Sequence, residues 1–137
     1  MAAPTELLQR VPLFSDLDRR ELEGVASSMK ERTFNPGDTI AEEGKGGVGF
    51  FVIESGAASV SVRGEERAKL GAGDYFGEIA LIADVDRTAT VTADSELRCW
   101  GMTFWDFRPL VESNASIAWK LLQVMGKRLQ AAEQRST

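Results

Sequence analysis

The glycines divide this chain into three parts. Eleven of the 13 glycines lie between Gly37 and Gly101, and only Gly24 and Gly126 lie outside that stretch. Glycine destabilises helix interiors and is favoured in tight turns, so the middle part is predicted to consist of short strands and turns. The two glycine-poor ends are predicted to be helical.

The middle part contains eight short runs of strand-forming residues, each bounded by turn residues such as Asn35 to Asp38 and Glu54 to Gly56. Eight short strands at this spacing indicate a small roll, barrel or sandwich. The predicted strands cover residues 32–34, 39–41, 48–53, 57–62, 68–70, 75–76, 88–93 and 97–101.

The first glycine-poor part predicts a helix. Ser15 and Asp18 match the Ser-x-x-Asp pattern of a helix N-terminus. Apolar residues then recur at helical spacing, and the helix is predicted to end near Lys30.

The last part predicts two helices. Thr103 is an N-cap residue for a short helix that ends near Val111. Ser113 or Asn114 caps a second, longer helix that runs to about Ala132.

The longer helix carries two apolar stripes. Two interpretations are open: both stripes pack on the core of the domain, or one of them pairs with the same helix of a second copy. The stripe that would form such a homodimer consists of Ala118, Leu122, Met125, Leu129 and Ala132, and the other consists of Ile117, Leu121 and Val124.

Composition excludes several classes of function. The chain contains no histidine, which argues against imidazole catalysis, His-ligated haem and the usual zinc sites, so no metal site is expected. The single Cys99 cannot form an internal disulfide and is expected to be buried in its apolar run. A net charge of −5 disfavours nucleic-acid binding by this chain.

The same composition limits where the protein is expected to act. No apolar run reaches the ~20 residues that span a bilayer, and the N-terminus lacks the apolar core of a secretory signal. We therefore expect a cytoplasmic protein that does not enter membranes.

Two further patterns predict no ligand site. Gly44 to Gly49 satisfy G-x-G-x-x-G, but the β-prone run Phe50 to Ile53 follows, whereas a dinucleotide-binding turn must open a helix. We interpret this stretch as a strand connection. Asp84, Asp86 and Asp94 lack the spacing of a calcium loop, and we interpret them as solvated.

The segment from Phe76 to Val91 carries the candidate site. Glu78 to Ile82 is predicted to form one helical turn, and the unpaired N–H groups at its start attract an anion. Gly77 has no Cβ, so a ligand can lie against its backbone. The planar fork of Arg87 engages two phosphate oxygens, and Thr88 adds a hydroxyl donor. These groups together predict a pocket for a compact anion.

Glu78 narrows the choice of anion. A carboxylate repels a phosphate, so Glu78 requires a donor such as a ribose 2′-hydroxyl. A 3′,5′-cyclic nucleotide offers both groups, with the hydroxyl for Glu78 and a single phosphate charge for Arg87. The alternative is that Glu78 and Arg87 only form an ion pair with each other.

Several stretches resemble the cyclic nucleotide-binding domain family. GDYFGEIALI followed by RTATV resembles that family's phosphate-binding cassette, and VPLFSDL, NPGDTIAEEG and FFVIESG match the surrounding sequence. The similarity extends from about Leu7 to Gln130 and is closest to the bacterial catabolite activators. It implies a β-roll in which Glu78 accepts the ribose hydroxyl while Arg87 and Thr88 bind the cyclic phosphate.

The resemblance also implies the fold and the remaining contacts. The expected fold is mostly β, an eight-stranded β-roll of the jelly-roll type with N-terminal helices and a C-terminal helix pair. The other expected ligand-binding residues are Gly77, Ile79, Ala80 and Ala89, and the expected base and sugar pocket residues are Val60, Ala68 and Leu70, together with Ile79.

One domain is expected over residues 1–137. In this division the N-terminal helices occupy 1–31, the β-roll 32–102 with its cassette at 76–91, and the C-terminal helices 103–134.

Two departures from the bacterial activators bear on function. Those proteins place hydroxyl residues late on the long helix against the base, whereas Ala132 and Glu133 stand here. They also continue into a helix-turn-helix, whereas this chain ends at Thr137. Thr88 is compatible with cAMP and with cGMP and does not select the base.

The expected function is therefore a regulatory module that binds cAMP or cGMP and transmits ligand occupancy through its C-terminal helix. It is expected to need no cofactor and to carry no DNA-binding domain. The alternatives are a ligand-free scaffold or dimerisation domain of the same fold, and the sensor fragment of a transcription regulator. An enzyme acting on the cyclic phosphate would need a metal or general base, and Glu78 is already assigned to the sugar.

Overall fold

Two four-stranded antiparallel sheets form the centre of the protein. A computed structural model describes residues 2–42, 44, 49–83 and 89–136. The sheets have the strand orders β1-β8-β3-β6 and β2-β7-β4-β5. The predicted mostly β fold with flanking helices is confirmed. The strands are β1 (Lys30–Phe34), β2 (Thr39–Ala41), β3 (Phe50–Ser55), β4 (Ala58–Val62), β5 (Glu65–Leu70), β6 (Tyr75–Phe76), β7 (Thr90–Ala93) and β8 (Leu97–Met102).

Several strand boundaries differ from the prediction by one to three residues. At β3 and β5 the reason is that pairing extends the strand. β3 continues to Ser55, which pairs with Arg98 of β8, so the turn predicted at Glu54 and Ser55 is wrong and the chain turns at Gly56. β5 begins at Glu65 and is mostly exposed and charged, so its pairing with β4 is not visible as an apolar run.

The first sheet separates two apolar cores. Phe50 and Val52 of β3 pack with the helices, whereas Phe51 and Ile53, on the opposite face of the same strand, pack between the two sheets. β8 alternates in the same way, and its Cys99 is fully buried as expected. The protein therefore has three layers: helices, first sheet and second sheet.

The N-terminal helices are α1 (Thr5–Gln9), the 3₁₀ turn η1 (Pro12–Phe14) and α2 (Arg19–Ser27). The predicted N-cap Ser15 is wrong, because α2 begins three residues later with Asp18 as its cap. Asp18 accepts a hydrogen bond from the Glu21 N–H at 2.9 Å, and Glu21 accepts from the Asp18 N–H at 3.0 Å. This reciprocal box satisfies two N–H groups, whereas the Ser15 hydroxyl donates to a carbonyl of η1 instead. α2 also ends before Lys30, which belongs to β1.

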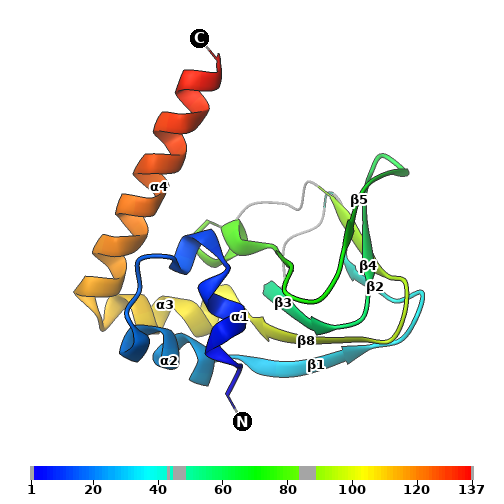
Figure 1. Ribbon diagram of the computed structural model, residues 1–137, viewed down its shortest axis with the longest axis horizontal. Coiled ribbons are helices and arrows are strands. Elements are labelled where there is room, and N and C mark those ends of the chain that lie inside the picture. Colours follow the sequence, from blue (N-terminus) through cyan, green and yellow to red (C-terminus); the bar gives the residue numbers. More distant parts are fainter. Residues whose placement is uncertain (1, 43, 45–48, 84–88, 137) are drawn as a thin grey trace.

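The C-terminal helices are α3 (Phe104–Glu112) and α4 (Ala115–Ser136). Thr103 caps α3 as predicted, and Asn114 Oδ1 accepts from the Ile117 N–H at the start of α4. Figure 1 shows α1, α2 and α3 grouped on one side of the sheets and α4 extending away from them. No helix within the described residues is long and apolar enough to cross a membrane.

Only one apolar stripe of α4 is buried in the core. Ile117, Leu121 and Val124 are at most 6% exposed, whereas Leu122 and Leu129 of the other stripe are 63% and 62% exposed. The interpretation that both stripes pack on the core is therefore wrong for Leu122 and Leu129, whereas Met125 of the same stripe packs against the core.

Candidate functional site

A tight turn between the two sheets carries the candidate site. Gly77 has φ +82°, in the left-handed region that favours glycine, and it precedes the 3₁₀ turn η2 (Glu78–Leu81). On one side, Phe76 stacks on Phe51 of β3, with ring centroids 5.4 Å apart. On the other side, Leu81 is buried among the helices. The turn is thus fixed at both ends, and this placement directs Glu78 inward.

Glu78 is a buried carboxylate with two different oxygens. The residue is 8% exposed, and its Oε1 lies 3.1 Å from Nη2 of Arg128 on α4. Its Oε2 is buried and has no hydrogen-bond partner within the described part of the chain. A buried charged oxygen without a donor is unfavourable, so Oε2 marks a position where a donor from a ligand would be stabilised.

Tyr75 of β6 lies in the same electrostatic environment. Burial first, and then the negative charge of Glu78, raise the pKa of the Tyr75 phenol, while Arg128 partly opposes the shift. Tyr75 therefore stays neutral near Glu78, and Arg128 is the cation that pairs with this carboxylate.

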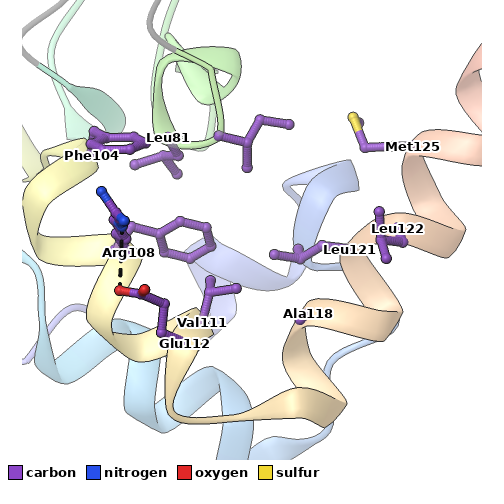
Figure 2. A pocket seen from close by; sticks show the side chains of 11 residues that line it. Leu81, Phe104, Arg108, Val111, Glu112, Ala118, Leu121, Leu122 and Met125 are labelled. Atoms are coloured by element: carbon purple, nitrogen blue, oxygen red, sulfur yellow. Dashed lines mark ion pairs between the residues drawn. The ribbon is translucent and has the colours of Figure 1, made fainter.

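A hollow lies beside the turn, between η2, α3 and α4. It has a volume of about 510 Å³ and is lined mainly by apolar side chains. Figure 2 shows Leu81 and Phe104 on one side of it and Leu121, Leu122 and Met125 on the other. The ion pair of Arg108 with Glu112, 3.3 Å long, also belongs to its lining.

Comparison with known proteins identifies the family of this fold. The sequence model described as "Cyclic nucleotide-binding domain" matches residues 31–114, more than half of the chain. The chain belongs to the cyclic nucleotide-binding domain family. Domains of this family are regulatory, ligand-binding units rather than catalytic ones.

Curated relatives and a solved structure agree with this assignment. The chain is 42% identical over 93 residues to the cAMP-dependent protein kinase regulatory subunit of Yarrowia lipolytica, a match that covers 66% of the chain and 25% of that protein. It is 35% identical over 107 residues to the potassium/sodium hyperpolarization-activated cyclic nucleotide-gated channel 2 of Mus musculus, covering 78% and 12%. The chain thus spans a quarter or less of the lengths of these relatives.

One similar solved structure is the crystal structure of the N-terminal domain of a transcriptional regulator from Streptomyces coelicolor A3(2). It superposes with a TM-score of 0.88 at 28% identity and covers 96% of this chain and 95% of that one.

The structure brings together part of the cyclic nucleotide-binding site expected from the sequence. Gly77 and Glu78 lie in the turn as expected, while Ile79 is 40% exposed. The Ala80 N–H donates to the Gly77 carbonyl at 3.0 Å and is already used within the turn. Ala89 is half-buried just before β7. Arg87 and Thr88 lie outside the described residues.

The expected pocket residues lie on the β4–β5 hairpin. Val60 pairs with Ala68 across the hairpin, and Ala58 pairs with Leu70. Val60 and Leu70 are partly buried against the core between the sheets, whereas Ala68 is exposed. The hairpin thus buries apolar side chains on the side of the core and exposes Ala68 to solvent.

Arg128 was not predicted as a partner of Glu78. The alternative prediction paired Glu78 with Arg87 and with no residue of the long helix. A signal for Arg128 was present, because Arg128 continues the buried stripe of Ile117, Leu121 and Val124 at helical spacing. A cation on the inward face of a helix requires an acidic partner on the element it packs against.

Proposed function

We propose that this chain binds a 3′,5′-cyclic nucleotide, with the ribose 2′-hydroxyl donating to Oε2 of Glu78. The observation that carries this proposal is the buried Oε2, which has no hydrogen-bond partner among the residues that the structure describes. A ribose hydroxyl supplies the missing donor at little cost, because Arg128 already compensates the charge through Oε1. The name of the Yarrowia relative, a cAMP-dependent kinase subunit, supports cAMP as the first ligand to test.

In this proposal the cyclic phosphate lies beside Gly77, where the absence of a Cβ leaves room for it. Arg87 and Thr88 bind its oxygens. The backbone at Ile79, Ala80 and Ala89 forms the rest of the segment that surrounds the phosphate. Val60, Ala68 and Leu70 contact the base or sugar. Binding is the whole activity, and no catalytic step is assigned to the chain.

Ligand occupancy is transmitted through the contact of Glu78 with Arg128. The ligand buries the Glu78 carboxylate further, and a buried carboxylate is stable only with its counter-charge in place. The ligand therefore favours the position of α4 in which Arg128 reaches Glu78, and by reciprocity that position of α4 favours the ligand. The output is proposed to act on a longer regulator that contains this domain.

Calorimetry with cAMP, cGMP and 2′-deoxy-cAMP tests the proposal. We expect cAMP or cGMP to bind, and 2′-deoxy-cAMP to bind about tenfold more weakly than cAMP because it lacks the donor for Oε2. Glu78→Ala should abolish that difference between cAMP and its deoxy analogue. Equal affinity of the wild-type protein for the two would contradict the role of Glu78. The absence of binding by both cAMP and cGMP would instead favour a ligand-free scaffold.

The second proposed function is homodimerisation through α4. The stripe of Ala118, Leu122, Met125 and Leu129 begins at the apolar hollow of Figure 2, which its first three residues line. Leu122 and Leu129 are largely exposed. A second copy of α4 laid along this stripe would bury them, which is favourable by about 25 cal/mol per Å² of apolar area.

Light scattering after size exclusion tests the dimer. Leu122→Lys and Leu129→Lys should each convert a dimer into a monomer, whereas Gln123→Lys, on another side of the helix, should not. A wild-type protein that is monomeric at every concentration would contradict this proposal without affecting the ligand site.

A further inference from the structure

Helix α4 is attached to the N-terminal part of the chain by two ion pairs on one of its sides, one to α2 and one to the connection before it. Lys120 Nζ lies 2.6 Å from Glu21 Oε1, and Lys127 Nζ lies 3.7 Å from Asp16 Oδ2. Glu21 is only 7% exposed, whereas the side chains of Lys127 and Asp16 are 73% and 37% exposed. Exposed ion pairs contribute little, so the pair of Lys120 with Glu21 is the stronger attachment.

The carboxylate of Glu21 that binds Lys120 is held in place by other hydrogen bonds. The same Oε1 that faces Lys120 accepts a hydrogen bond from the Asp18 N–H, and the Glu21 N–H donates back to Asp18. This capping box leaves the Glu21 side chain little freedom. The hydrogen bond from Lys120 and the bond from Asp18 also lower the pKa of Glu21, so its carboxylate remains charged at neutral pH.

The spacing on α4 relates this attachment to the ligand site. Arg128 follows Lys120 by eight residues, which in an α-helix is about 12 Å along the axis and about 80° around it. Any rotation of α4 at Lys120 therefore moves Arg128 sideways relative to Glu78. The Arg128 side chain is 42% exposed, so surrounding packing alone does not hold its guanidinium.

We propose that Lys120 and Glu21 form a positioning pair, which fixes the rotation of α4 so that Arg128 meets Oε1 of Glu78 and Oε2 remains available to the nucleotide sugar. This inference rests on the proposed binding of a cyclic nucleotide. Lys120 and Glu21 act through Arg128 and do not themselves touch the ligand. They therefore tune affinity from a position on α4 about 80° around the axis from Arg128.

Calorimetric titration with cAMP on four variants tests this pair. Lys120→Met retains the aliphatic stem and removes the charge, and we expect its dissociation constant for cAMP to rise about fivefold. Glu21→Gln keeps an acceptor for the capping box and should show the same loss. Lys120→Arg should restore most of the affinity. The control Arg19→Met removes an exposed pair with Glu23 on the same helix α2 and should change nothing.

Two comparisons separate positioning from a general loss of stability. On the Arg128→Ala background, Lys120→Met should cause no further loss, because the route to Glu78 is already removed. With 2′-deoxy-cAMP as the probe, Lys120→Met should also have no effect. Unchanged cAMP affinity in folded Lys120→Met, or an additive loss on the Arg128→Ala background, would overturn the inference.

A ligand-free measurement keeps this inference separate from the proposed function. In Lys120→Met without nucleotide, amide hydrogen exchange should rise at residues 124–130 and remain unchanged in Arg19→Met. If the wild-type protein binds no cyclic nucleotide, the proposed function fails, and this exchange experiment alone decides whether Lys120 positions Arg128. Exchange equal to that of the wild type would then reject the positioning role.

Discussion

Each carboxylate oxygen of Glu78 needs a hydrogen-bond donor or a cation, which water would supply if the side chain were exposed. Its Oε1 has a cationic partner in Arg128, and its buried Oε2 has no donor within the described residues. Leaving a charged acceptor without a donor costs about 1–3 kcal/mol, which a ligand hydroxyl recovers on binding. At the scale of single residues, the site therefore suits a ligand that carries a hydroxyl donor close to an anionic group.

Arg128→Ala removes the counter-charge of Glu78. We expect cAMP to bind about tenfold more weakly, because the carboxylate must then be buried by the ligand without a cation. Calorimetry measures this loss. Arg135→Ala, an exposed arginine in the last turn of the same helix, is the matched control and should bind as the wild type does. An unchanged affinity of Arg128→Ala would show that Arg128 does not support Glu78.

Gly77→Ala tests the backbone of the turn. At φ +82° an alanine is strained by about 1–2 kcal/mol, so we expect lower stability in urea denaturation and weaker cAMP binding. The control Gly126→Ala lies in the helix α4, where an added Cβ meets nothing within 4 Å, and it should raise stability by up to about 1 kcal/mol. A Gly77→Ala protein as stable as the wild type would mean that the turn relaxes to another conformation.

At the scale of elements, the sequence predicts that a helix or strand exists better than it predicts where that element begins and ends. The cap Thr103 was predicted because it stands alone before an apolar pattern, whereas Asn114 was predicted only as one of two candidates, together with Ser113. Near α2 two cap patterns overlap, and only the reciprocal bond between Asp18 and Glu21 decides between them. Glu21 also pairs with Lys120, a residue far along the chain, and local sequence does not contain that contact.

The pair that joins α2 to α4 also predicts a pH dependence. Because the pKa of Glu21 lies below its ordinary value of 4.5 in the folded protein, its stabilising contribution is present above that value and is lost as the pH falls through the lowered pKa. Glu21→Gln should therefore be less stable than the wild type at about pH 7, and the difference should shrink as the pH falls below 4.5 and through the lowered pKa of Glu21.

Urea denaturation across this range measures the effect. Glu23→Gln removes a carboxylate from an exposed pair on the same helix and should match the wild type throughout. A stability difference between wild type and Glu21→Gln that stays constant with pH would contradict the ionic role of Glu21.

At the scale of the whole molecule, the sequence predicts the eight strands and the flanking helices but not how they pair. The order β1-β8-β3-β6 joins strands from both ends of the chain, and no local pattern encodes such pairing. Gly77 and Glu78 were predictable because the chemistry of the site is local to one turn. The spacing of Arg128 on the inward side of α4 was visible in the sequence, but its contact with Glu78 was not predictable, because that contact depends on where α4 packs.

β3 joins the two cores of the protein. Its residues alternate between the helical core, which receives Phe50, and the core between the sheets, which receives Ile53, and both side chains are fully buried. A strand with two buried faces transmits the loss of packing on one face to the other, because its hydrogen bonds to β6 and β8 are shared.

Phe50→Ala and Ile53→Ala should therefore each destabilise the whole molecule in a single step. We expect losses of about 3–5 kcal/mol for Phe50→Ala and about 2–5 kcal/mol for Ile53→Ala. Urea denaturation followed in parallel by tryptophan fluorescence and circular dichroism should give coincident transitions for both variants. Leu129→Ala, which truncates an exposed side chain of α4, should remain within about 0.5 kcal/mol of the wild type. If Phe50→Ala instead separates the two signals, the helices and the β-roll unfold independently, and a ligand bound at Glu78 would have no rigid body through which to act on α4.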